Sequence, residues 1–438
     1  MISNILPRLF FALAGWIALA AHAALPIQHW TTPEGARVYF VESHNLPMLD
    51  VSLDFPAGSA FDSADKAGLA KMTQVMLDQG AGAMSEEDIA NKLADVGADL
   101  GGRFDRDRAG VTLRTLSSAK ERGEALAILV NVLQHPRFPD AAFQRERDRM
   151  LAGLKEQEAQ PEDVADKAFY RAVYGSHPYS LPENGNAQGL NQLQRENLVD
   201  FYRAHYVAAG AVIAMIGDLS RAEAEQLAGQ ISAGLPKGPA PAGIAAPVAV
   251  KPETIKLKLP STQSHILMGL QGMSRTDPDY FPLYVGNYVL GGGGFDSRLL
   301  EEVRQKRGYA YSAYSYFNPM VQAGPLEIGL QTRQEHTDDA LKVARETVQT
   351  FVAQGPTQEE LTQAKGNLVG GFPLRLDSNK KILEYLSAIG FYRLPLNYLD
   401  TWTSKVEAVN LDQVRDAFKR RVNPDALAVI VVGPEAKP

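Results

Sequence analysis

Two segments of this 438-residue chain recur at the same distance along the sequence. Leu151-Ala152-Gly153 returns as Leu368-Val369-Gly370, and FYRAHYVAAGAVIAMIGDLS from Phe201 is echoed by FKRRVNPDALAVIVVGPE from Phe418; both offsets are 217 residues. Chance could align one such pair, but hardly two at one offset. The chain is therefore predicted to consist of two related halves.

A segment rich in Pro, Ala and Gly separates these halves. The sequence GLPKGPAPAGIAAPVAVKPE, from Gly234 to Glu253, has neither helical nor strand periodicity, which indicates an extended linker. The chain length also favours two or more domains, since a domain usually has about 100 to 200 residues. We predict one domain over residues 24–233, a linker over 234–254 and a second domain over 255–438, each domain having about 200 residues.

Hydrophobic patterns predict strands and helices in each half. A strand is predicted over 49–55, where apolar residues alternate with other residues: Leu49, Val51, Leu53 and Phe55. A helix is predicted over 67–79, where apolar residues at spacings of three and four share one face: Leu69, Met72, Val75 and Met76. Ser85, followed three positions later by Asp88, is typical of a helix start. The expected fold class is α+β, with two homologous domains in which an antiparallel-rich sheet packs against helices. Further strands are predicted at 38–41, 111–116, 211–216, 265–270 and 427–432, and further helices at 118–134, 140–160, 163–174 and 280–290.

A run of glycines stands out in the second half. Gly291, Gly292, Gly293 and Gly294 lead into a predicted short helix with Leu299, Leu300 and Val303, capped by Asp296 or Ser297 and ended by Gly308. Tyr309, Tyr311, Ala313 and Ser315 are then predicted on one side of a strand. A phosphate-binding loop needs Lys and Ser or Thr after its glycines, and here an acidic residue follows instead. We therefore predict a flexible loop that lines a cleft.

The N-terminus has the pattern of a secretory signal peptide. One positive side chain within residues 1–8 precedes an apolar run over 9–20 and then Ala21-His22-Ala23, a small-x-small cleavage signature. The apolar run has about a dozen residues, short of the roughly 20 that span a bilayer, so an uncleaved anchor is the weaker alternative. Residues 1–23 are predicted to be removed near Ala23, which would leave a chain with no membrane span in the bacterial periplasm.

Composition excludes several chemistries. The chain has no cysteine, which rules out disulfides, thiolate ligands and a thiol nucleophile. A net charge of -7 without a long run of Lys or Arg argues against nucleic acid as a partner. None of the eight histidines has the HxxEH, HxxxH or HxH spacing of a metal site.

A family resemblance joins several of these segments. The run GGGGFDSRLLEEVRQKRGYAYSAYS resembles the C-terminal half of M16 (pitrilysin or insulinase-like) metallopeptidases, in which a helix arginine and a tyrosine seven positions later face the active site. That spacing fits Arg304 and Tyr311. The segment PAGSAFD after the early strand pair, YGSHPYSLP from Tyr174, the linker and the duplicated final strands extend the resemblance over most of the chain. It implies half of an M16 peptidase-like clamshell.

The resemblance also shows which metal-site residues this chain lacks. Active members carry G-x-A-H-x-x-E-H on the helix after the strand pair, with two zinc-binding histidines and a glutamate base, and a third ligand glutamate on a later helix. Here Lys71 and Val75 stand at the histidine positions and Gln74 at the base, while Leu151, Ala152 and Gly153 stand where the last ligand is expected.

These replacements cannot support the chemistry. A catalytic zinc needs about three protein ligands and a base for its water. Val75 has no lone pair, Gln74 cannot take up a proton near neutral pH, and Lys71 brings a positive charge. No cofactor is expected in this chain.

Arg304 and Tyr311 can still have a catalytic role. A tyrosine hydroxyl beside a cation can donate a hydrogen bond to the oxyanion of a peptide-hydrolysis intermediate. The residue pattern alone favours another interpretation, in which Arg304 pairs with Glu301 and Tyr311 packs in a core. The resemblance favours the first interpretation.

In the family, two-domain chains of this size pair as heterodimers that close around unfolded peptides. The resemblance implies that this chain is the zinc-less subunit. It would supply Arg304 and Tyr311 to the zinc site of a partner, flank the cleft with residues 291–294 and bind peptide at an extended edge strand. Two alternatives stay open: a periplasmic peptide-binding or scaffold protein without a role in hydrolysis, and a metalloenzyme with unfamiliar ligands.

Overall fold

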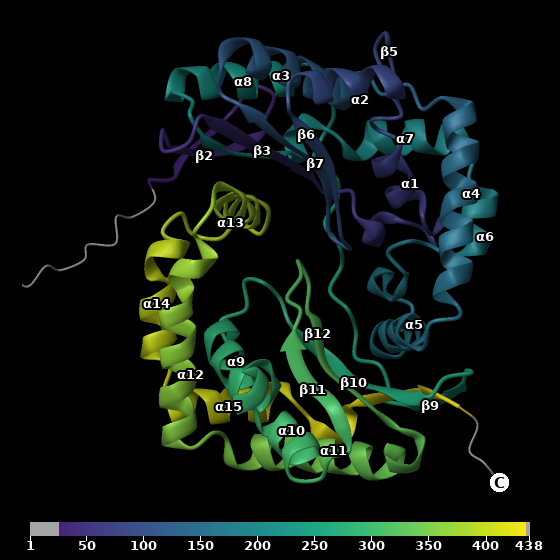
Figure 1. The fold of residues 1–438 in the computed structure, drawn as a ribbon, viewed down its shortest axis with the longest axis vertical. Helices are drawn as coiled ribbons and strands as arrows, with labels where there is room; N and C mark the ends of the chain where they lie inside the picture. The colour runs from purple at the N-terminus through teal and green to yellow at the C-terminus, as the bar shows by residue number, and fades with distance from the viewer. Residues whose placement is uncertain (1–25, 435–438) are drawn as a thin grey trace, which may run out of the picture.

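The computed structural model describes residues 26–434, so the predicted signal peptide lies outside the described residues. A sheet covered by helices lies on each side of the predicted linker (Figure 1). The first half contains β1 (Gln28–Thr31), β2 (Arg37–Glu42), β3 (Met48–Phe55), α1 (Leu69–Val75), β4 (Gly80–Ala81), β5 (Met84–Ser85), α2 (Glu86–Asp95), β6 (Asp99–Phe104), β7 (Ala109–Leu116), α3 (Ala119–Gln134), α4 (Asp140–Gln157), α5 (Pro161–Tyr174), α6 (Ala187–Gln192), α7 (Arg195–His205), β8 (Val212–Gly217) and α8 (Arg221–Ala233). The second half contains β9 (Thr254–Lys258), β10 (Gln263–Met273), α9 (Tyr280–Asn287), α10 (Arg298–Leu300), β11 (Ala310–Phe317), β12 (Gly324–Arg333), α11 (Thr337–Gln354), α12 (Gln358–Gly371), α13 (Asn379–Phe391), α14 (Tyr398–Ala408), α15 (Leu411–Arg421) and β13 (Ala428–Gly433).

Apart from the additional edge strand β1 of the first sheet, the two large sheets have the same topology. The first has the order β1-β2-β8-β3-β7-β6 and the second the order β11-β12-β10-β13-β9, so β2-β8-β3-β7-β6 corresponds to β9-β13-β10-β12-β11. The pairs β2–β8 and β9–β13 are parallel, and the other neighbouring pairs of these two sheets are antiparallel. The predicted α+β class with two homologous, antiparallel-rich layers is confirmed.

The helix predicted over 67–79 is shorter than its pattern suggests. Gly68 has a φ of +107°, which places it outside the helix, and the N–H of Met76 bonds to both Met72 and Gln74 as the last turn tightens. Met76 and Leu77 are buried beyond the end of the helix, while Val75, predicted on the buried face, is only half-buried. Burial continues past the helix, so the apolar pattern overestimates its length.

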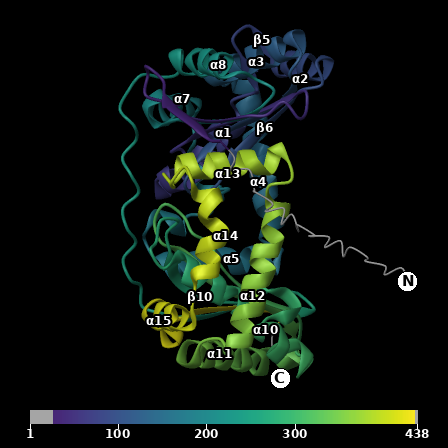
Figure 2. The ribbon, with the colours of Figure 1, turned by 90° about the vertical axis from the view of Figure 1, so that its left-hand side faces the viewer.

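Each half lends one helix to the sheet of the other. Helix α13, from the second half, packs on β2, β3 and β8 of the first sheet, whereas α5, from the first half, packs on β10 and β13 of the second. Figures 1 and 2 show α13 lying directly against the sheet of the first half. The hydrophobic clusters therefore cross between the halves: Phe169 of α5 shares a cluster with Ile430, and Leu386 of α13 shares one with Val212.

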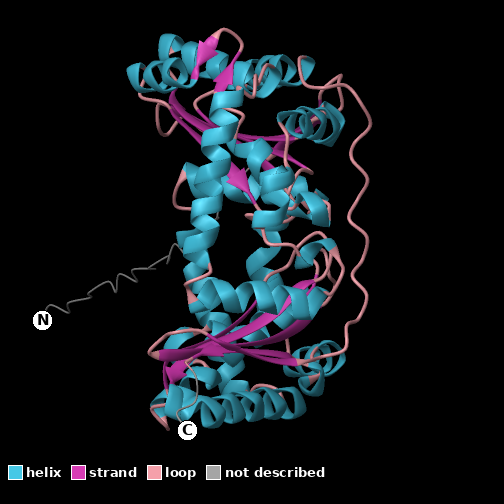
Figure 3. Cartoon of the chain, turned by 90° about the vertical axis from the view of Figure 1, so that its right-hand side faces the viewer, coloured by secondary structure: helices cyan, strands magenta, loops and turns pink. Residues whose placement is uncertain are grey.

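The linker runs along one side of the molecule. Residues 236–253 form no helix or strand, and Figures 2 and 3 show them as an extended loop along the long axis. Gln322 Nε2 donates a hydrogen bond to the carbonyl of Ile244 (2.7 Å), and Gln271 Nε2 donates one to that of Val248 (2.8 Å). Within residues 26–434, no helix is both long and apolar enough to cross a membrane.

Candidate functional site

Helix α1 carries three of the four positions where the resemblance implies metal-site residues. The Asp62 carboxylate accepts hydrogen bonds from the backbone N–H groups of Gly68 (2.7 Å) and Ala70 (2.8 Å), which fixes the start of the helix. Burial raises the pKa of Asp62 to about 7, although these two hydrogen bonds act in the opposite direction. The helix contacts β6, the edge strand of the first sheet.

Lys71 and Gln74 contact each other and β6. Lys71 Nζ donates a hydrogen bond to Gln74 Oε1 (3.4 Å) and lies 4.9 Å from the centroid of the Phe104 ring. Burial lowers the pKa of Lys71. Gln74 is buried against the edge strand, where a Cβ atom on Gly102 would lie 2.0 Å from its Nε2. Gly102 therefore provides the space that Gln74 occupies, a role that the sequence pattern did not reveal.

These residues do not fit a zinc ion. Helix α4, which contains Gly153, contacts α1 as the resemblance implies, but Gly153 offers no side chain there. An ammonium, an amide and the aliphatic side chain of Val75 supply neither the ligands nor the base that a catalytic zinc requires. In the part of the chain from residue 26 to residue 434, no group of three His, Cys, Asp or Glu side chains could hold a metal ion.

Arg304 and Tyr311 lie against each other at the surface. The Arg304 guanidinium is 4.7 Å from the centroid of the Tyr311 ring and 5.1 Å from that of Phe295. The exposed fractions of Tyr311 and Phe295 are 80% and 68%. A cation between two aromatic rings is held in place while both rings stay accessible. Phe295 was not singled out in the sequence, and the structure adds it to this pair.

The alternative of a Glu301 partner and a buried tyrosine is wrong. Glu301 pairs with Lys306 at 3.0 Å, and among the described residues no carboxylate lies within ion-pair distance of Arg304. The high exposure of Tyr311 excludes it from the core.

A bulge in β11 explains why Tyr311 is exposed. Ala310 pairs with Thr332 and Ala313 with Leu330, so β11 has one more residue than β12 across this interval. The extra residue shifts the alternation, and Ala310, Ala313 and Ser315 are buried while Tyr311 points to solvent. The prediction that Tyr309, Tyr311, Ala313 and Ser315 share one side of the strand is wrong for this reason.

The glycine run is helical instead of being the predicted flexible loop. Residues 288–292 continue α9 as a π-helical turn, and residues 294–296 form a 3-10 turn. A Cβ atom on Gly291 would lie 2.3 Å from the backbone nitrogen of Ser315, so a glycine is needed for the close approach of this turn to β11. Asn287 fixes the same contact, because its Nδ2 donates to the Ser315 carbonyl (2.9 Å) and its Oδ1 accepts from the Ser315 hydroxyl (2.7 Å). Ser297 is the N-cap of α10, but its hydroxyl donates to the Gly294 carbonyl and caps no N–H group.

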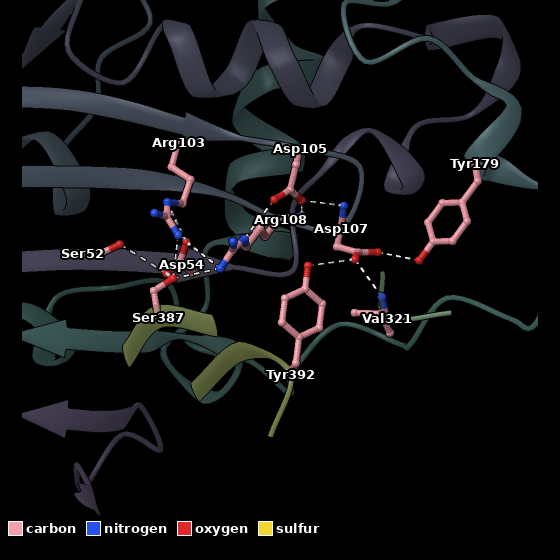
Figure 4. A network of polar contacts seen from close by, with 10 residues as sticks. All are labelled: Ser52, Asp54, Arg103, Asp105, Asp107, Arg108, Tyr179, Val321, Ser387 and Tyr392. Carbon is pink, nitrogen blue, oxygen red and sulfur yellow. Dashed lines mark hydrogen bonds and ion pairs between the residues drawn. The ribbon is translucent and has the colours of Figure 1, made fainter. Parts of the chain in front are cut away.

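A polar network joins the two halves and was not predicted (Figure 4). Asp54 is fully buried, and its Oδ2 accepts a hydrogen bond from the Ser387 hydroxyl at 2.6 Å. Arg103 and Arg108 each donate to the same hydroxyl, at 2.7 and 2.8 Å, and lie 3.7 Å from Asp54 Oδ1. Asp54 alternates with the apolar residues of β3, and its side of the strand meets α13.

A second carboxylate lies in the same interface. Asp107 accepts hydrogen bonds from the hydroxyls of Tyr179 (2.5 Å) and Tyr392 (3.3 Å) and from the N–H of Val321 (2.8 Å). Burial raises the pKa of Asp107 to about 6. These contacts connect four separate parts of the sequence, two from each half.

Comparisons with known proteins identify relatives of both halves. Residues 37–185 match the family model described as insulinase (peptidase family M16), and residues 192–368 match the one described as peptidase M16 inactive domain. A crystal structure of a peptidase M16 inactive domain from Pseudomonas fluorescens is 39% identical, has a TM-score of 0.91 and covers 94% of this chain and 100% of that chain. An uncharacterized zinc protease YmxG of Bacillus subtilis is 25% identical over 92% of this chain and 98% of its own length. A non-peptidase homolog YmxG of Helicobacter pylori is 24% identical over 91% of this chain and 92% of its own length.

Proposed function

Because this chain belongs to peptidase family M16, the insulinase family, we propose that it is the non-catalytic subunit of a heterodimeric zinc peptidase. In this role it binds unfolded peptides and supplies Arg304 and Tyr311 to the zinc site of a catalytic M16 partner. The name of the Helicobacter pylori relative, a non-peptidase homolog, supports the first part of this proposal.

One contrast within the chain carries the proposal. The positions of the metal site on α1 hold Lys71, Gln74 and Val75, which cannot bind zinc, yet Arg304 and Tyr311 remain in contact at the surface. Tyr311 is largely exposed and therefore accessible to a second molecule. Its hydroxyl can donate a hydrogen bond to an oxyanion, and the guanidinium on its ring adds positive charge nearby.

Edge strands support the peptide-binding part of the proposal. β6 and β11 lie at the ends of their sheets, and each therefore has one side without a neighbouring strand. An extended peptide can add to such an edge through main-chain hydrogen bonds. The turn at 288–292 covers β11 at Ser315. β11 also carries Tyr311, so a peptide paired with the start of this strand would lie close to the proposed catalytic pair.

The test combines the purified chain with a zinc-bearing M16 relative encoded beside it. We expect no peptide hydrolysis by this chain alone and hydrolysis by the mixture. Tyr311→Phe should lower kcat of the mixture by about 10²- to 10³-fold, the usual effect of removing one oxyanion donor. Arg304→Ala should also lower kcat, whereas Arg307→Ala, which removes a nearby exposed cation that pairs with Glu302, should leave it unchanged.

Two results would contradict the proposal in different ways. Full hydrolysis by the isolated chain, with zinc in stoichiometric amount, would mean a metalloenzyme with unfamiliar ligands. Unchanged turnover in the Arg304→Ala and Tyr311→Phe mixtures would leave only the alternative of a peptide-binding scaffold.

We also propose that the chain acts in the periplasm. Support comes from the signal-peptide pattern of residues 1–23. N-terminal sequencing of the chain purified from a periplasmic extract should begin directly after Ala23. A chain that keeps its N-terminus and sediments with membranes would contradict this proposal.

A further inference from the structure

A pocket of 680 Å³ lies between the two halves, within this single chain. Its walls come from α9, α13, α14 and residues 273–275, 317–319 and 374–375 of the second half, and from Arg103 and Arg108 of the first half. In Figure 1 these helices lie on the left-hand side of the region between the two sheets, with α13 nearest the first sheet. The volume is within the range of about 300 to 1,000 Å³ that is usual for ligand sites.

The pocket carries an excess of positive charge. Five cationic side chains line it against one carboxylate, that of Glu384. Three of the five are already paired: Arg103 and Arg108 lie beside Asp54, and Lys381 pairs with Asp377. The remaining two are Arg275 and Arg375.

Arg275 and Arg375 have aromatic neighbours in place of acidic ones. Arg275 is half-buried; its guanidinium donates to the Tyr280 hydroxyl at 3.2 Å and lies 5.3 Å from the centroid of the Tyr392 ring. Arg375 is exposed at the pocket and lies 5.6 Å from the centroid of the Trp402 ring. Within residues 26–434, no carboxylate lies within 4 Å of either guanidinium. Because a guanidinium has five N–H donors in a planar fork, most of this donor capacity is available to an anion.

The rest of the pocket wall is mostly aromatic and apolar. The rings of Tyr280 and Tyr284 stack at 5.8 Å, and Trp402 meets Tyr284 edge to face at 6.0 Å. Tyr284, Phe317 and Tyr385 are half-buried at the same surface, so part of each ring stays open to the pocket. A wall of this kind suits an apolar or aromatic side chain. An inorganic anion alone would leave it unfilled.

These two features together define the ligand. We propose that this pocket binds the C-terminal residue of a peptide, with its carboxylate paired to the Arg275 and Arg375 charges and its apolar side chain against the aromatic wall. The inference deepens the peptide-binding part of the proposed function and rests on it. Every lining residue belongs to this chain, so binding can be measured on the isolated chain.

The test measures peptide binding to the isolated full chain by calorimetry. The probe is an N-acetylated hexapeptide that ends in Phe, with either a free C-terminal carboxylate or a C-terminal amide. We expect the free acid to bind at least about tenfold more tightly than the amide, as charge-assisted pairing to arginine implies. The double variant Arg275→Gln, Arg375→Gln should lose this preference, whereas Arg333→Gln, an exposed arginine of β12 outside the pocket, should keep it.

Several results would overturn the inference. Equal binding of acid and amide by the unaltered chain would do so, as would a preference that survives in the double variant. A third probe, an amidated peptide with Asp before the final Phe, carries a side-chain carboxylate in place of the C-terminal one. If it bound as tightly as the free acid, recognition of the C-terminus would be contradicted. The single variant Arg375→Gln changes an exposed side chain and should preserve the circular dichroism spectrum. A partial loss of the preference for the free acid can therefore be measured in this variant even if the double variant fails to fold.

Because hydrolysis by the mixed complex is a separate assay, failure of this inference is distinguishable from failure of the proposed function.

Discussion

The Ser387 hydroxyl occupies the centre of the contact between the two halves. It donates to the fully buried Asp54 carboxylate and accepts from Arg103 and Arg108. Asp54 Oδ1 has no hydrogen-bond partner, while Oδ2 accepts from the hydroxyls of Ser387 (2.6 Å) and Ser52 (3.3 Å), so Ser387 provides the shorter bond to this carboxylate. A buried charge of this kind is costly when one of its partners is removed.

Ser387→Ala should therefore lower the free energy of unfolding by about 1 to 3 kcal/mol, since it removes a hydrogen bond from a buried carboxylate. Urea denaturation followed by circular dichroism would measure the change. Ser404→Ala serves as the matched control, because Ser404 is exposed on α14 and should change stability by less than about 0.5 kcal/mol. Equal unfolding midpoints for the two variants would contradict the role assigned to Ser387.

Glycines at two places in the second half have different functions. Gly291 lies in the π-helical turn after α9, where a Cβ would meet both the backbone nitrogen and the hydroxyl of Ser315, at 2.3 and 2.4 Å. Gly366 lies in the middle of α12 and faces solvent, with nothing within 4 Å of a Cβ. Packing therefore requires a glycine at position 291. At position 366 the glycine has no such role and lowers the stability of the helix.

Gly291→Ala should lower the free energy of unfolding by about 1 to 3 kcal/mol, the usual cost of overpacking. Gly366→Ala should raise it by about 0.5 to 1 kcal/mol, because alanine stabilises a helix relative to glycine. Thermal and urea unfolding of both variants would measure these opposite changes. If Gly291→Ala were as stable as the unaltered chain, packing against Ser315 would not explain the glycine run. Such a result would favour the proposal that residues 291–294 flank a peptide-binding cleft.

The sequence predicted those elements whose signals are local. The alternation over Leu49 to Phe55 predicts β3, and Ser85 with Asp88 predicts the start of α2, where the structure has a complete capping box. The bulge in β11 and the π-helical turns were not predictable, because they depend on how α9 and β11 fit together. Of the candidate site, the pair Arg304 and Tyr311 came from the resemblance, but the exposure of Tyr311 follows from the bulge.

The exchange of α5 and α13 between the halves could not be predicted from either half alone. Both helices have an apolar face, as a helix on its own sheet would also have. The two helices lie at equivalent places in the repeat, yet the repeat does not specify on which sheet each one packs. For the same reason the sequence did not reveal that Asp54 lies beneath α13, since this helix comes more than 300 residues later in the chain.

This exchange makes the two halves depend on each other physically, independently of the linker that joins them. The side chains of α13 share a hydrophobic cluster with the first sheet, and those of α5 share one with the second. The linker itself is largely exposed and contributes few contacts by comparison. Separation of the halves would expose both of these buried helix faces to water, at roughly 25 cal/mol for each Å² of apolar surface.

A chain cut in its linker should therefore remain one particle. A protease recognition sequence inserted after Gly238, which is exposed, allows the cut to be made in the folded protein. Size-exclusion chromatography at micromolar concentration should give the same elution volume before and after cleavage, while denaturing electrophoresis shows two fragments. The cut protein should also unfold in a single transition, at a lower temperature that depends on concentration, because its two pieces must now associate. Two separate peaks on the column, or two independent unfolding transitions, would mean that each half is stable without the helix it receives from the other.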